Sequence, residues 1–187
     1  MRKSQGTYRA LMMVIAVAVV TVMVLPSAAR SQDVAVGSAT ATVLAALSVT
    51  ATQALAFGDV FQGIPKSVAN TDAAAGIFTM SGTANAGISL YLELPDYLVL
   101  ADGSDRMVIA FSTTDASVDT TGGGDPTGMV GGDGYLNINP FSLPGTANLS
   151  NLGAANIYLG GRVIPTVDQK AGAYSGDIVL TVSYNGT

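Results

Sequence analysis

The residues of this chain that could do chemistry are almost all aspartates. The 187-residue sequence contains no histidine and no cysteine, and Glu93 is the only glutamate among its 13 acidic residues. Without histidine, a serine or threonine lacks its commonest activating base, and without cysteine, thiol catalysis is excluded. Glu93 alternates with leucines in an apolar run, so we expect a solvated side chain rather than half of a catalytic carboxylate pair. The composition therefore predicts a protein that is not an enzyme.

Aspartates beside glycines are the remaining candidates, as oxygen ligands for calcium. Asp102 and Asp105 share one predicted turn and are the candidate pair. The acidic spacing of known calcium loops is absent, and aspartates in tight turns ordinarily accept hydrogen bonds from their own backbone. The glycine-rich segment 120–134 has no lysine followed by serine or threonine, as a phosphate-binding loop requires. We therefore expect neither a metal nor a cofactor.

The N-terminus has the three regions of a secretory signal peptide. Three basic residues precede an uncharged apolar run over residues 10–25, and small residues follow. The run is shorter than the roughly 20 residues that span a bilayer, so a retained membrane anchor is the less favoured alternative. We expect cleavage after Ala29 or Ser31, with residues 1–31 as the signal peptide and the remainder secreted.

Removal of residues 1–31 would leave 156 residues with four basic and 13 acidic side chains, a net charge of −9. So acidic a surface disfavours nucleic acid and anionic lipid as partners. About 156 residues suffice for one domain with its own core, without disulfides.

Apolar and polar residues alternate along most of the mature chain, and a period of two predicts β-strands. The longest alternation, residues 38–52, would extend about 50 Å, more than most strands, so part of it is expected to overhang the domain. Further strands are predicted over residues 77–82, 88–94, 107–113, 135–141, 155–164 and 177–184. Turn residues separate these strands, and we expect residues 120–134 to form a long hairpin connection. This pattern predicts an antiparallel sandwich or barrel.

Several motifs together resemble one family. They are Leu55-Ala56-Phe57-Gly58, the run from Ile88 to Pro95, Leu159-Gly160-Gly161-Arg162, and Gly172-x-Tyr174-x-Gly176 followed by Leu180 to Tyr184. Over about residues 39–185 the chain is similar to secreted bacterial β-sandwich proteins of unassigned function, related to spore coat protein U and to the pilins of archaic chaperone–usher fimbriae.

The resemblance implies an all-β, antiparallel immunoglobulin-like sandwich that lacks one strand. In such pilins the N-terminal extension of the next subunit fills the resulting groove, a mode called donor-strand complementation. Residues 32–52 would hold the extension and the first strand, and residues 53–187 the sandwich. Carried onto this sequence, the donor strand would present Val34, Val36, Ala39, Ala41 and Val43, and the acceptor groove would be walled by Ile178, Leu180, Val182 and Tyr184.

The function implied is that of a structural subunit of a bacterial surface pilus or coat, forming a homopolymer used in cell adhesion. A periplasmic chaperone and an outer-membrane assembly protein would be its further partners. The alternative is a secreted domain whose extension folds back into its own groove, and which binds glycan or calcium through its glycine- and aspartate-rich loops.

Overall fold

The computed structural model describes residues 37–123 and 134–186. The predicted signal peptide, its cleavage site, Val34 and Val36 lie outside the described residues. The chain divides into two units, residues 1–41 and 42–187. In the first unit, residues 37–41 are exposed and form no strand. No helix in the described ranges has the length and apolar character needed to cross a membrane.

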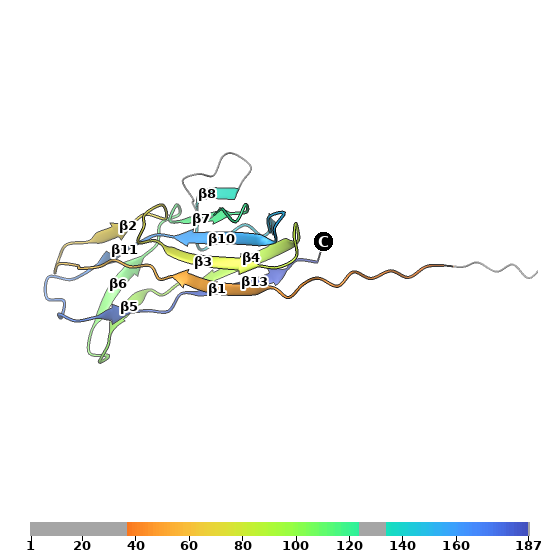
Figure 1. Ribbon diagram of the computed structural model, residues 1–187. Helices are drawn as coiled ribbons and strands as arrows, with labels where there is room; N and C mark the ends of the chain where they lie inside the picture. The colour runs from red at the N-terminus through yellow and green to blue at the C-terminus, as the bar shows by residue number, and fades with distance from the viewer. Residues whose placement is uncertain (1–36, 124–133, 187) are drawn as a thin grey trace, which may run out of the picture. The chain divides into compact units, whose positions relative to one another are not determined.

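The second unit is built from antiparallel β-strands arranged in three sheets (Figure 1). The strands are β1 (Ser48–Gln53), β2 (Lys66–Val68), β3 (Gly76–Ser81), β4 (Gly87–Glu93), β5 (Tyr97–Leu100), β6 (Arg106–Ala110), β7 (Ala116–Asp119), β8 (Gly134–Ile138), β9 (Ala147–Asn148), β10 (Ala154–Leu159), β11 (Gly161–Ile164), β12 (Tyr174–Ser175) and β13 (Val179–Tyr184). The sheets have the strand orders β1-β3-β10-β7-β8, β12-β5-β6-β11-β2 and β13-β4-β9. The predicted all-β antiparallel fold is confirmed.

The main core lies between the sheet that begins with β1 and the sheet that begins with β13. Alternate residues point inward because successive side chains of a strand face opposite sides. Phe78 and Met80 on β3, with Ile157 on β10, meet Ile88 and Leu90 on β4, and all five are buried. This packing is the two-layer sandwich that alternation predicted.

The sheet β12-β5-β6-β11-β2 is linked to the main sandwich by a strand that continues beyond a break. β10 and β11 are one run of chain interrupted at Gly160, where a Cβ atom would come within 2.5 Å of the Val68 carbonyl oxygen. The backbone approaches its neighbour so closely there that glycine is required. A smaller core around Met107, Ile109 and Val163 covers one face of this sheet.

The first strand is shorter than its sequence pattern predicts. Alternation runs through residues 38–52, but the strand occupies only Ser48–Gln53, and residues 42–46 are exposed and strandless. β1 pairs with β3, which ends at Ser81 opposite Ser48. Residues before Ser48 therefore have no partner strand to supply ladder hydrogen bonds, and alternation alone does not hold a strand.

Other predicted strands end early where turns intervene. The strand predicted over residues 107–113 stops at Ala110, because Ser112 donates its backbone N–H to Asp115 Oδ2 at 2.7 Å. The strand predicted over residues 135–141 stops at Ile138, since Asn139 Oδ1 accepts the N–H of Phe141. β7 and β8 pair antiparallel, so the 120–134 segment does connect a hairpin.

Candidate functional site

Two of the edge strands of the second unit, β1 and β13, border one opening. Among the described residues, β1 pairs only with β3, and β13 pairs only with β4. The two strands run in opposite directions along one opening: Tyr184, the last residue of β13, contacts the chain before β1, whereas Ile178 and Leu55 line the same cavity at the other end. Free strand edges present unpaired N–H and C=O groups, which makes them templates for an added strand.

The core is incompletely covered along this opening. Ile178, Leu180, Val182 and Tyr184 all pack against the main core but stay only partly buried, while Val179, Thr181 and Ser183 between them are exposed. On β1, Val49 pairs with the buried Met80, yet Val49 is 38% exposed. By contrast, Ile88, Leu90 and Leu92 on the interior strand β4 are buried. We call the opening between β1 and β13 the edge groove. The name includes the cavity into which this opening continues at the end lined by Ile178 and Leu55.

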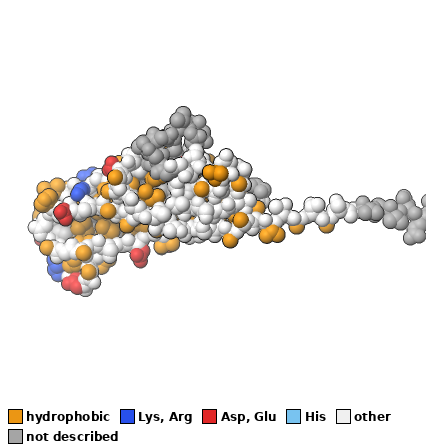
Figure 2. All heavy atoms as spheres, viewed as in Figure 1, with side chains coloured by type: hydrophobic (Ala, Val, Ile, Leu, Met, Phe, Trp, Pro, Cys, Tyr) orange, Lys and Arg blue, Asp and Glu red, His pale blue; other side chains and the backbone are white. Residues whose placement is uncertain are grey.

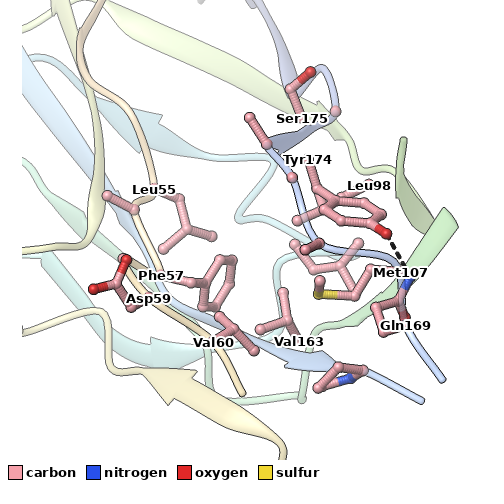
Figure 3. Close-up of a pocket in the computed structure, with 18 of the residues that line it drawn as sticks. Leu55, Phe57, Asp59, Val60, Leu98, Met107, Val163, Gln169, Tyr174 and Ser175 are labelled. Carbon is pink, nitrogen blue, oxygen red and sulfur yellow. Dashed lines mark hydrogen bonds between the residues drawn. The ribbon is translucent and has the colours of Figure 1, made fainter. Parts of the chain in front are cut away.

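The edge groove widens at one end into a cavity of about 1090 Å³. Leu55, Phe57 and Val60, in the chain that follows β1, form one side (Figure 3). Leu98, Met107 and Tyr174 form the other side, and Val163 lies between the two. Most of these side chains are apolar, so the cavity suits an apolar side chain or strand rather than a charged group.

Tyr184 bridges the other end of the edge groove. Its hydroxyl donates to the carbonyl oxygen of Ala45 at 2.9 Å and accepts the backbone N–H of Thr83 at 2.7 Å. Gly82 makes room for this contact, because a Cβ atom there would collide with the Tyr184 hydroxyl. The groove is thus spanned by a side chain at one end and opens into a cavity at the other.

A polar cluster fixes the cavity wall that contains Tyr174. The Tyr174 hydroxyl lies 2.6 Å from Asp105 Oδ2 and accepts a hydrogen bond from Gln169 Nε2. Asp105 Oδ2 also accepts from Gln169 Nε2 and from the backbone N–H of Lys170. The hydrogen bonds from Tyr174 and then from Lys170 lower the pKa of Asp105 to about 2. Burial raises the pKa of Tyr174, and its hydrogen bond to Asp105 raises it further.

The candidate calcium ligands are engaged in these and similar local bonds. Asp105 Oδ1 accepts the N–H of Arg106, and Asp102 Oδ1 accepts the N–H of Ser104 at 2.9 Å. The hydrogen bonds from Ser104 lower the pKa of Asp102. Within residues 37–123 and 134–186, no three His, Cys, Asp or Glu side chains come close enough together to hold a metal ion. The structure gives Asp105 the role of holding a loop.

The residues assigned to the donor strand are accessible where they are described. Ala39, Ala41 and Val43 are exposed and belong to no strand, and Val43 is 93% exposed. The four residues assigned to the groove wall lie together along β13. Sequence reasoning missed the opposite wall, residues 54–62, although the alternation of Leu55 and Phe57 was a usable signal.

No protein-family model matches the chain, and no curated protein matches it. It is similar to one chain of a solved chaperone–tip adhesin complex involved in the biogenesis of CFA/I fimbriae. The identity is 14% over 75% of this chain, with a TM-score of 0.39, and this chain spans 42% of the length of that one. It is also similar to a family 123 glycoside hydrolase from Clostridium perfringens, at 15% identity over 76% of this chain and 25% of the hydrolase, with a TM-score of 0.31. Both likenesses cover less than half of the compared chain, so any function must be argued from this protein's own geometry.

Proposed function

We propose that the protein is a structural subunit that polymerises by strand donation. The N-terminal extension of one copy, residues 34–43, inserts into the edge groove of the next copy and completes its sandwich. The observation that carries the proposal is the pair of free edges, β1 and β13, which flank a line of half-buried inward side chains. A complete sandwich would bury those side chains as fully as it buries Ile88.

Strand insertion would give hydrogen-bond partners to unpaired backbone groups and would bury apolar side chains at the same time. An added strand can pair with the unpaired groups of β13 or β1, as in other cases of β-strand addition. It would also cover Leu180 and Val182. Full burial of one such side chain contributes on the order of 1.5 to 3 kcal/mol, so covering several half-exposed ones adds up to a stable contact.

The lengths of the two partners match. From Gly176, which lines the cavity, to Tyr184 the groove spans nine residues, or about 30 Å at ~3.3 Å per residue. Residues 34–43 number ten and would span about 33 Å when extended. Within this segment Ala39, Ala41 and Val43 would fall on one face of a strand, and Thr40 and Thr42 on the other, which suits one face in a groove and the other in solvent. Residues 37–43, the described part of the segment, form no strand in the single chain.

Such an assembly would be a surface pilus or coat, as the family resemblance implies. The mature subunit would be exported, and a periplasmic chaperone would have to cover the same groove before assembly, since an open apolar edge invites aggregation. An outer-membrane assembly protein is the further expected partner. The polymer would serve adhesion or protection without catalysis.

Assembly can be tested with the exported chain, residues 32–187, and the same chain lacking residues 33–44. We expect the intact chain to form multimers that resist SDS without heating, and the shortened chain to remain monomeric. A synthetic peptide of residues 33–46 should bind the shortened chain and, in excess, block multimers of the intact chain. A monomeric intact chain that does not bind the peptide would rule the proposal out and favour a self-complemented domain.

A further inference from the structure

Three apolar side chains at the cavity end of the second unit are more than half exposed. Phe61, Ile64 and Val167 are 73%, 59% and 83% exposed. They lie on two loops joined by a hydrogen bond from the N–H of Gly63 to the carbonyl oxygen of Thr166, at 2.9 Å. We call these three residues the end patch; Figure 2 shows hydrophobic side chains gathered at this end, where β2, β5 and β11 lie.

An exposed leucine stands at the Tyr184 end. Leu152 is 84% exposed, in a turn closed by the hydrogen bond from the N–H of Gly153 to the carbonyl oxygen of Ser150. The N–H of Gly82 donates to the carbonyl oxygen of Gly153 at 2.8 Å, and Thr83, next in the chain, accepts the N–H of Ala45 through its hydroxyl at 2.7 Å. The Leu152 turn therefore lies beside the point where the extension leaves the domain.

The geometry of the edge groove decides which end a donor copy occupies. Few residues separate the donor segment, 34–43, from Ala45, which Thr83 holds. The body of the donor must therefore sit close to the end of the groove that its extension enters. Tyr184 spans one end, so the extension enters through the cavity end, beside the end patch of the acceptor.

We infer that successive copies also meet end to end, with the Leu152 turn of the donor copy packed on the end patch of the acceptor copy. This inference rests on the proposed strand donation and adds a second contact surface to it. The contact is heterologous, joining two different surfaces of the same chain, and such contacts generate open filaments, or rings where the rotation closes, rather than two-fold dimers. It also removes from water four apolar side chains that the isolated domain exposes.

Charge substitutions test the contact without touching the groove. Val167→Lys and Leu152→Glu should each lower the yield of SDS-resistant multimers at least about tenfold, because each places a charge against an apolar surface. Carried together in one chain, they should restore most of the yield, since Lys at 167 of one copy then faces Glu at 152 of the next. Leu136→Lys is the matched control: Leu136 is 48% exposed on β8, away from both ends, and its substitution should leave the yield unchanged.

Peptide binding separates this inference from the proposed function. The 33–46 peptide should bind the Val167→Lys and Leu152→Glu versions of the shortened chain within about twofold of the unsubstituted one, because the groove is intact. Normal multimers from both single variants, or a double variant no better than either, would overturn the end-to-end contact alone. Failure of the unsubstituted chain to bind peptide or form multimers would overturn both proposals.

Discussion

Tyr184, on the last strand, donates its hydroxyl to the carbonyl oxygen of Ala45, 139 positions earlier in the chain and 2.9 Å away. This bond ties the end of β13 to the residues that precede β1. It places the point where the extension joins the domain and the end of the final strand at one end of the sandwich. The direction in which the edge groove can be filled follows from this contact.

The hydrogen bonds of the Tyr184 hydroxyl should contribute measurably to the free energy of unfolding. Tyr184→Phe removes the bond to Ala45 and leaves the N–H of Thr83 without its acceptor, so we expect a loss of about 1 to 3 kcal/mol in the free energy of unfolding. Tyr91→Phe is the control, because Tyr91 is 64% exposed on β4. Urea unfolding of both variants gives the comparison, and equal losses would contradict a specific role for Tyr184.

Acid should weaken the cavity wall through Asp105. The folded pKa of about 2 lies below the ordinary value of 3.8, so the ionised carboxylate is favoured by folding. Its stabilising contribution is therefore complete above pH 4 and is lost as the pH falls through about 2. The midpoint of thermal unfolding should fall over this window and should fall less in Asp105→Asn. An identical pH dependence in both proteins would show that Asp105 does not contribute.

Substitutions on β13 should distinguish its two faces. Leu180 points into the edge groove and Thr181 points to solvent. In the chain lacking residues 33–44, Leu180→Asp should weaken binding of the 33–46 peptide at least about tenfold, because it sets a charge against an apolar strand. Thr181→Asp should change binding little. Circular dichroism of each variant checks that the fold persists, and equal effects on peptide binding would argue against insertion beside β13.

The break between β10 and β11 should tolerate only glycine. At Gly160 an added Cβ would meet backbone atoms of residues 68–70, the nearest at 2.5 Å, and backbone cannot move aside cheaply. Gly160→Ala should therefore cost about 2 kcal/mol or more. Gly145 has open space around it, so Gly145→Ala should be close to neutral. Chemical denaturation reports both, and a neutral Gly160→Ala would contradict the close approach.

Period-two alternation predicted the strands that have one face inward and one outward. β3, β4 and β13 are of this kind, and each was found within about two residues of its bounds. β7 was missed although its four residues alternate between apolar and polar, because the run is shorter than the others and its polar residues are buried as fully as its apolar ones. Its Ser117 is accommodated inside by a hydrogen bond from Asn70, 47 positions away, which no local pattern reveals.

The groove wall on β13 followed from alternation and resemblance, whereas the cavity depended on tertiary packing. Residues 54–62 form no strand, and the short alternation of Leu55 and Phe57 marks an inward face without showing that this face meets β5 and β6. Asp105 was considered as a calcium ligand because it lies near Asp102 in sequence. Its actual partner, Tyr174, lies 69 positions away, and only the fold brings the two together.

A density map of the assembled polymer, at a resolution that shows side chains, tests strand donation most directly. The map should show residues 34–43 of one copy as a strand between β1 and β13 of the next copy, hydrogen-bonded to one of those edges and covering Leu180 and Val182. A polymer whose edge grooves stay open, or hold the extension of the same copy, would contradict strand donation between copies.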